Sequence, residues 1–258
     1  MRPEHIVSVD PLKCTLCGSC CDDCPDKVLF LGEKSAEHNG HFCVKCGHCV
    51  AICPQGAASI SGFDDEPEEI RADKKVDSTA LLAQIKSRRS MRRFTDEDVA
   101  PELITQIIEA GRYTPTGGNK QGTSFVVIRD KKDEYEKITV DLLRKLQPQL
   151  SLKLPYLKEK VIEDGSIFKG APVAVLVKSI DALDGALAAS TMELFAQSLG
   201  LGVLYSGFFS RMVRASRKLK KELAVEPGEK VVTTLVIGYP AVKYLRTAQR
   251  ETARVVYR

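Results

Sequence analysis

Nine cysteines lie between Cys14 and Cys53 of this 258-residue chain, and they are its most reactive groups. Eight of them form two runs with one spacing, Cys-x2-Cys-x2-Cys-x3-Cys-Pro. Three thiolates at this spacing can bind successive corners of one cubane, so each run predicts a 4Fe-4S cluster. An odd number of cysteines cannot pair completely within one chain, which favours metal ligation in a reducing compartment over disulfides. The predicted ligands are Cys14, Cys17, Cys20, Cys24, Cys43, Cys46, Cys49 and Cys53.

The double run resembles that of bacterial two-cluster ferredoxins. The resemblance implies crossed ligation, in which the fourth ligand of each cluster comes from the other run. One cluster would then use Cys14, Cys17, Cys20 and Cys53, and the other would use Cys43, Cys46, Cys49 and Cys24. Structural zinc is the alternative, but zinc fingers use separated Cys-x2-Cys pairs with four ligands per ion. Cys21 fits no ligand position, and we expect it to be a spare thiol rather than a catalytic one.

The elements around the cysteines predict a small ferredoxin-like domain over residues 1–62. It contains an internal repeat, and each half ends in a short strand, at 28–31 and 58–61. A module of this size buries too little apolar surface to fold on its core alone, so we expect its metal to stabilise it. Residues 63–77 are charged and contain a proline, which predicts a linker.

Residues 78–258 alternate helical and strand patterns, which predicts an α/β sandwich with helices covering a small sheet. The fold class is therefore α+β overall. Strands are predicted at 123–128, 172–177, 202–205 and 230–238. Helices are predicted from Ser78, from Pro101 to before Gly111, over about 132–163 with interruptions at Pro148 and Pro155, over 181–199, and over 218–224.

Two motifs in the second domain resemble the FMN-binding signatures of the nitroreductase family. Ser87-Arg-Arg-Ser-Met-Arg-Arg-Phe94 resembles the phosphate and ribityl signature. Thr114-Pro-Thr-Gly-Gly-Asn-Lys-Gln121 resembles the second motif, Pro-Ser-x-x-Asn-x-Gln. Three later segments stand at the expected positions: Gly170-Ala-Pro-Val, Gly200-Leu-Gly202 and Ile237-Gly-Tyr-Pro240.

The resemblance implies which residues would bind FMN. Arginine donors suit a phosphate because the guanidinium is forked and always charged. The first motif supplies Arg88, Arg89, Ser90 and Arg92, of which Arg92 would add positive charge near the N1/O2 edge of the flavin. The second supplies Pro115, Thr116, Gly117 and Asn119, which in the family reach the flavin of the partner subunit. The turn Leu204, Ser206 and Gly207 would direct backbone N–H groups to the flavin, and Arg250 (or Arg246) would add a second phosphate contact.

The sequence departs from the family at two positions. Gly122 follows Gln121 where the family often has Pro-Trp, so the wall of the substrate site is expected to differ. Ser206 stands where some members carry Glu, so only a backbone role transfers to it.

Residues after 77 include no cysteine and no histidine. This excludes thiol nucleophiles, histidine acid–base catalysis and a His/Cys metal site from the second domain. Gly200-Leu-Gly202 lacks the third glycine, the preceding strand and the acidic partner of a dinucleotide-binding fingerprint. The chemistry is therefore expected to belong to a bound cofactor.

Charge is divided unequally along the chain. Residues 1–77 contain eight basic and fourteen acidic residues, whereas the rest contains thirty basic and twenty acidic ones. The opposite signs suit docking of one half on the other. The basic residues are scattered and accompany no nucleic-acid motif, so we expect no nucleic-acid partner. We also expect no membrane span and a cytoplasmic location, because no long apolar stretch or signal peptide is recognisable.

Together these features predict an anaerobic-type FMN-dependent oxidoreductase fed with electrons through two 4Fe-4S clusters. The expected acceptor is a small nitro, quinone or conjugated compound, and the donor is a low-potential protein or NAD(P)H. A homodimer is expected from the second motif. The alternative is a non-enzymatic electron-transfer module for a protein partner. An oxygen-using, flavin-fragmenting enzyme of the same fold is a third hypothesis, which exposed low-potential clusters disfavour.

Overall fold

The computed structural model describes residues 5–71, 73 and 75–258. Contacts divide the chain into two units. The N-terminal unit comprises Met1–Lys75 together with Gly117–Lys120, and the C-terminal unit comprises Val76–Thr116 and Gln121–Arg258. The predicted boundaries at residues 62 and 78 stay a prediction.

The N-terminal unit contains two small antiparallel sheets. Strand β1 (Val7–Val9) pairs with β4 (Ala58–Ile60), and β2 (Leu29–Leu31) pairs with β3 (Ala36–His38). The sequence predicted β2 and β4 but not β1 or β3, because three-residue strands carry little periodicity. Its core is small: among the described residues, the buried side chains that pack together are Cys20, Leu29, Ala36, Cys49 and Ala58.

The internal repeat of the N-terminal unit has matching backbone geometry in its two halves. Leu16 and Lys45 have φ values of 58° and 57°, and Gly18 and Gly47 have φ values of 79° and 78°. A short helix follows in each half, α1 (Ser19–Asp22) and α2 (His48–Ile52). The left-handed residues turn the chain sharply between successive cysteines, and the glycines do so without steric cost.

A four-stranded antiparallel sheet forms the centre of the C-terminal unit, in the order β5-β6-β8-β7. Its strands are β5 (Thr123–Ile128), β6 (Val173–Ser179), β7 (Gly202–Tyr205) and β8 (Lys230–Gly238). All seven residues of β6 are buried. A continuous apolar run of this kind is typical of a strand covered on both faces.

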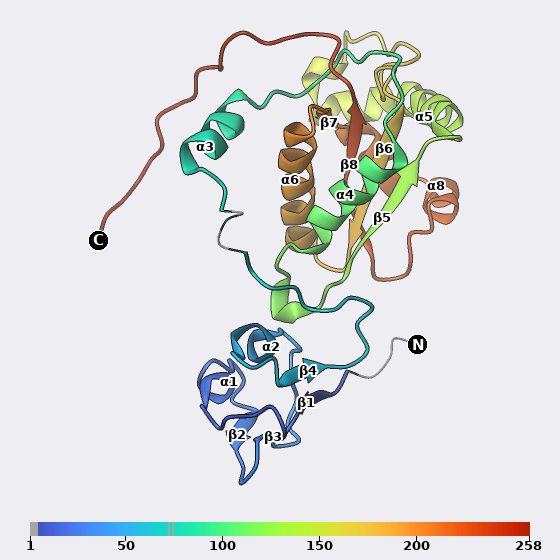
Figure 1. Ribbon diagram of the computed structural model, residues 1–258. Helices are drawn as coiled ribbons and strands as arrows, with labels where there is room; N and C mark the ends of the chain where they lie inside the picture. Colours follow the sequence, from blue (N-terminus) through green and yellow to red (C-terminus); the bar gives the residue numbers. More distant parts are fainter. Residues whose placement is uncertain (1–4, 72, 74) are drawn as a thin grey trace. The chain divides into compact units, whose positions relative to one another are not determined.

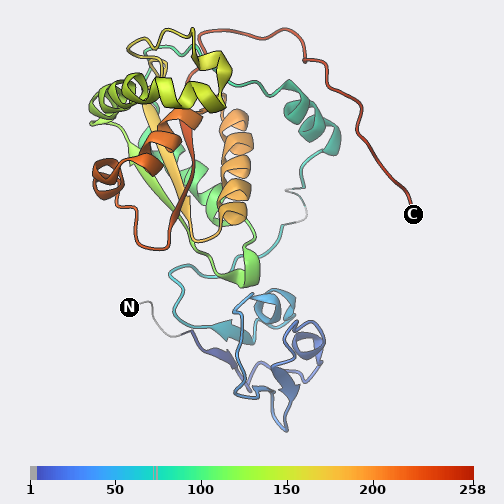
Figure 2. The same cartoon turned by 180° about the vertical axis from the view of Figure 1, so that it is seen from behind.

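Helices cover both faces of this sheet, so the C-terminal unit is the predicted α/β sandwich (Figures 1 and 2). Helices α4 (Pro101–Arg112) and α6 (Ala182–Ser198) lie on one face. Helices α5 (Lys132–Lys153), α7 (Gly207–Ala215) and α8 (Arg217–Glu222) lie on the other.

Alternate residues of β6 separate two apolar cores. Val173, Val175 and Val177 pack towards α4 and α6, whereas Ala174 and Leu176 pack towards α5, α7 and α8. Successive side chains of a strand point to opposite faces, which explains the division. At the edge of the unit, α3 (Ser78–Ser87) has no buried residue.

Several helix boundaries differ from the prediction. Asp77, not Ser78, caps α3, because its carboxylate accepts from the backbone N–H of Ala80 at 2.6 Å. Helix α4 continues past Gly111, where an added Cβ would lie 2.8 Å from Met192 and so would not fit. Helix α5 continues through Pro148, although a proline removes one backbone donor. Helix α7 was not predicted.

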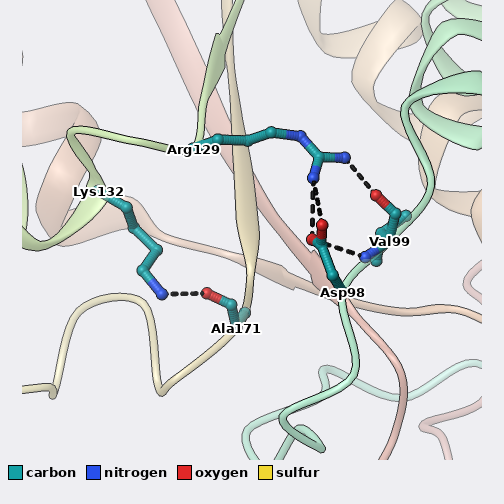
Figure 3. A network of polar contacts seen from close by, with 5 residues as sticks. All are labelled: Asp98, Val99, Arg129, Lys132 and Ala171. Atoms are coloured by element: carbon teal, nitrogen blue, oxygen red, sulfur yellow. Dashed lines mark hydrogen bonds and ion pairs between the residues drawn. The ribbon is translucent and has the colours of Figure 1, made fainter.

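A polar network fixes the segment that leads into α4 (Figure 3). Arg129, at the end of β5, donates to both carboxylate oxygens of Asp98 at 2.8 and 3.1 Å and to the carbonyl of Val99. Lys132 donates to the carbonyl of Ala171 at 2.8 Å, next to Gly170. Arg129 and Lys132 stand at the two ends of the short connection between β5 and α5. The bonds therefore join this connection to the segment before α4 and to the loop before β6.

Beyond β8 the chain continues to Arg258 without helix or strand (Figure 1). Among the residues that the structure describes, no helix combines the length and the apolar character needed to cross a lipid bilayer.

Candidate functional site

Two cavities in the N-terminal unit gather the cysteines of the double run. One is lined by four cysteines: Cys14, Cys17, Cys20 and Cys53. The other is lined by the remaining four: Cys24, Cys43, Cys46 and Cys49. Each cavity therefore combines three cysteines of one run with the last cysteine of the other, the arrangement that crossed ligation requires.

Backbone N–H groups point at four of the sulfur atoms, in two matching pairs. Leu16 and Lys45 donate to Sγ of Cys14 and Cys43 at 3.5 and 3.3 Å. The other pair, Val28 and Ala57, donates to Cys24 and Cys53 at 3.4 and 3.2 Å. Such bonds stabilise thiolates over thiols, so the cavities fit clusters with four thiolate ligands each.

Within the described ranges, no three His, Cys, Asp or Glu side chains are arranged to hold one metal ion. Cys21 lines neither cavity, and burial and the neighbouring Cys20 raise its pKa to about 11. The raised pKa supports the expectation that Cys21 is a spare thiol, which stays a prediction.

In the C-terminal unit, the first flavin motif lies along the edge strand β7. Ser90 forms a parallel bridge with Val203, and the N–H of Met91 donates to the Val203 carbonyl at 2.9 Å. Phe94 forms an antiparallel bridge with Pro240. The motif therefore lies next to Leu204, the first residue of the predicted flavin turn, although more than a hundred residues separate them in sequence.

Two glycines permit this close approach. A Cβ added at Gly202 would lie 2.7 Å from Met91, and one added at Gly238 would lie 2.8 Å from Pro172 and 3.0 Å from Phe94. Real Cβ atoms do not approach so closely, so a larger residue would push the motif away from the sheet. Both glycines belong to segments that carried the family resemblance.

Arg88 is oriented by an acidic residue that the sequence analysis did not single out. Its guanidinium donates to Glu193 of α6 at 2.7 Å, and the Glu193 side chain is 8% exposed against 36% for Arg88. The Arg88 head group thus keeps a solvent-facing side for an anion. A lone carboxylate in the apolar stretch of α6 was the signal that could have revealed Glu193.

Tyr205 belongs to the same buried cluster. Its hydroxyl donates to the Ala189 carbonyl at 3.2 Å. Burial, and to a smaller extent the Glu193 carboxylate, raise the pKa of Tyr205 far above its usual value. Tyr205 therefore stays protonated and acts as a hydrogen-bond donor.

The turn from β7 into α7 is anchored from both sides. The N–H of Ser206 donates to the Thr234 carbonyl at 2.8 Å, and its hydroxyl donates to the Ile167 carbonyl at 3.3 Å. Buried Glu136 in turn accepts from the backbone N–H of Ile167 at 2.7 Å. Gly207 is exposed, and a Cβ added there would meet no atom within 4 Å. A rigid backbone turn thus borders open space.

The remaining predicted flavin residues lie elsewhere. Arg89 is half-buried and Arg92 is exposed beside Ser90. Pro115 and Thr116 form a turn after α4, in which the Thr116 hydroxyl accepts from the N–H of Gln121 at 3.0 Å. The following residues, Gly117 and Asn119, group with the N-terminal unit.

Arg250 lies in the exposed tail, where it donates to the carbonyl of Gln249 at 3.3 Å. In the described part of the chain, no hydrogen bond or ion pair joins Arg250 to the first motif.

The residues of the C-terminal unit fit FMN in chemistry. Two half-buried arginines and a serine hydroxyl suit a phosphate, and the open turn at Gly207 offers space and backbone donors to a planar ring.

Residues 85–239 match the model of the nitroreductase family. The chain belongs to this family. Residues 6–73 match the model of a 4Fe-4S dicluster domain, so this family member carries an N-terminal iron–sulfur domain.

Individual relatives agree with this classification. A Methanothermobacter thermautotrophicus protein described as an NADH dehydrogenase/NAD(P)H nitroreductase is 27% identical over 181 residues, covering 67% of this chain and 83% of its own. A Bacillus subtilis FMN reductase [NAD(P)H] is 31% identical over 174 residues, covering 62% and 66%.

A solved structure of similar fold is a nitroreductase with bound FMN from Bacteroides fragilis, which shares 23% identity with this chain. It superimposes with a TM-score of 0.56 and covers 69% of this chain and 98% of its own. Membership of the family makes this protein an oxidoreductase, and the predicted fold is confirmed.

Proposed function

We propose that this nitroreductase reduces a small nitro, quinone or conjugated acceptor with electrons that enter through its iron–sulfur domain. The observation that carries the proposal is the pair of four-cysteine cavities in a chain whose C-terminal unit sets the first flavin motif beside the Leu204–Gly207 turn. FMN would supply hydride or electron-pair transfer, and two 4Fe-4S clusters would supply single electrons.

The chain's own residues would bind and orient these groups. Arg88 and Arg89 would bind the FMN phosphate, and Glu193 would fix the Arg88 guanidinium through its 2.7 Å ion pair. Arg92 would place positive charge near the ring, and the exposed turn at Gly207 would offer a backbone donor to it, because the N–H of Ser206 already donates to the Thr234 carbonyl. The absence of histidine and cysteine from this half supports an acceptor that takes its protons from water.

We also propose a homodimer with two flavins at its interface, to which Pro115–Asn119 of each subunit contribute. Apolar side chains on α3 and the tail support it, since Leu82 is 50% exposed, Ile85 48% and Leu245 78%. Light scattering is expected to give twice the chain mass for the FMN-loaded protein. A monomer with stoichiometric FMN would refute the dimer.

An anaerobic acceptor screen tests the activity. The protein is reduced with a chemical donor, and flavin reoxidation is followed on addition of nitro, quinone and conjugated compounds. We expect rapid reoxidation by at least one of these classes. Reoxidation by electron-carrier proteins alone would identify the non-enzymatic alternative.

Two variants test the assigned roles. Arg88→Ala should lower FMN content because it removes a phosphate donor, whereas Arg93→Ala in the same motif should not. Cys43→Ser should slow flavin reduction by a protein donor much more than it lowers FMN content, whereas Cys21→Ser should leave both unchanged. Unchanged donor-driven reduction in Cys43→Ser would exclude the iron–sulfur domain as the entry route.

A further inference from the structure

The short turn Gly117–Asn119 groups with the iron–sulfur unit although it follows α4 in sequence. Gly118, Asn119 and Gln121 have φ values of 58°, 50° and 48°. Two of these are not glycines, and left-handed backbone at such residues costs free energy. Asn tolerates this conformation better than most residues. The turn therefore holds Asn119 in one defined orientation.

The side chain of Asn119 bonds the turn between two predicted cluster ligands. Its amide nitrogen donates to the carbonyl of Val44 at 3.2 Å and to that of Lys45 at 2.7 Å. Val44 and Lys45 stand between Cys43 and Cys46. Both hydrogens of the half-buried amide are thus directed at the second cysteine run.

One of these bonds continues to a sulfur atom through a single peptide group. The Val44 carbonyl and the Lys45 N–H belong to the same peptide, and that N–H donates to Cys43 Sγ at 3.3 Å. Donation to the carbonyl polarises the peptide and strengthens the N–H bond to sulfur. Hydrogen bonds to cluster sulfurs are one determinant of reduction potential, because they stabilise the more negative reduced cluster.

The described residues supply no such side-chain donor to the first cysteine run. Leu16 has the same left-handed conformation as Lys45 and donates to Cys14 Sγ at 3.5 Å. Among the described residues, however, no side chain donates to the carbonyl of Thr15 or Leu16. The two halves therefore share their backbone geometry. They differ because a side-chain amide donates to the peptide that bonds Cys43 Sγ, whereas no described side chain donates to the peptide that bonds Cys14 Sγ.

We propose that Asn119 is a positioning residue that makes the two clusters inequivalent. Through the Val44–Lys45 turn it raises the reduction potential of the cluster at Cys24, Cys43, Cys46 and Cys49 above that of the other. That cluster takes up one electron first, from the donor or from the lower-potential cluster, which is oxidised by one electron. Asn119 also lies four residues after Pro115 in the segment assigned to FMN. The inference rests on the proposed cofactors.

An EPR-monitored redox titration of the full-length protein tests the inference. The wild type should show two one-electron steps. Asn119→Gly removes the amide but accepts the left-handed backbone, and Asn119→Asp keeps the shape but has no N–H to donate. Both substitutions should lower the midpoint potential of the upper step. At a fixed potential, the ratio of reduced to oxidised cluster should fall about threefold, which corresponds to a potential shift of about 28 mV at 59 mV per tenfold change. The lower step should stay in place.

Lys120→Ala, an exposed neighbour in the same turn, is the control and should shift neither step. Iron and FMN contents are measured in every variant. Two unshifted steps in both Asn119 variants, or a shift of the lower step alone, would overturn the inference. Loss of FMN with unshifted potentials would also overturn it and would assign Asn119 to the flavin alone. A wild type without iron would instead refute the proposed function.

Discussion

The two units of this nitroreductase-family protein differ in the size of their cores. Among the described residues of the N-terminal unit, the core consists of five buried residues that pack together, and two of them, Cys20 and Cys49, are predicted cluster ligands. The C-terminal unit has an apolar core on each face of its sheet, with Phe168 and Phe209 fully buried and their ring centroids 4.9 Å apart. We therefore expect the first unit to depend on metal–thiolate bonds, whereas the second depends on burial of apolar surface.

This difference predicts which amino-acid substitutions each unit tolerates. A unit with a small core loses its fold when a ligand is removed but is insensitive to substitution of exposed apolar residues. A unit with two large cores responds to cavities, because close-packed interiors relax only partly. Three experiments can break or sharpen the comparison.

The largest effect is expected at a cluster ligand. Cys53→Ser removes one of the four thiols of the cavity with Cys14, Cys17 and Cys20, so iron should fall well below the expected value of about eight per chain. Protease resistance of the N-terminal unit should fall with it, while the C-terminal unit stays resistant. Cys21→Ser is the matched control and should keep the full iron content. About four irons in the wild type, or zinc, would refute two clusters.

A cavity in the second unit should have the next largest effect. Phe168→Ala removes a fully buried ring and should lower the free energy of unfolding of the C-terminal unit by about 3–5 kcal/mol. Phe42→Ala, whose side chain is 81% exposed in the first unit, should change stability by less than about 0.5 kcal/mol. Denaturant unfolding measures both. Comparable losses would show that the two units do not differ as described.

The smallest effect concerns pH and a buried ion pair. Glu229 pairs with Lys178 at 2.9 Å and accepts from the Ser124 hydroxyl at 2.5 Å. Burial alone would raise the pKa of Glu229, but Ser124, the Glu226 backbone and Lys178 together lower it below the usual range.

A lowered folded-state pKa stabilises the fold above the unfolded-state pKa, and this stabilisation is lost as the pH falls through the folded-state value. Glu229→Gln should therefore lose about 1–3 kcal/mol near neutral pH and show a flatter decline in acid. Parallel pH profiles of the two proteins would contradict this assignment. The iron content should be the same in both.

Much of the fold followed from periodicity and turn residues. Strand β5 was predicted with its observed limits, because five of its six residues are β-branched or aromatic, the types that are enriched in strands. Helix α7 was missed, since the exposed Gly207 at its start obscures the periodicity of the residues that follow. The continuation of α5 through Pro148 was also missed, because local signals favour a break there and tertiary packing does not.

The sequence by itself determined which cofactors to expect. The spacing of the eight cysteines predicts two clusters, and the Ser87–Phe94 motif, through its resemblance to the nitroreductase family, predicts FMN, because residues close together in sequence can supply the ligands of one group. Only the tertiary structure decided the pairings over long distances. The Arg88–Glu193 ion pair, the approach of Met91 to Gly202 and the bonds from Asn119 to the Val44–Lys45 turn join residues 74 or more positions apart. No local pattern encodes such contacts, since they form only when packing of the whole chain brings those residues together.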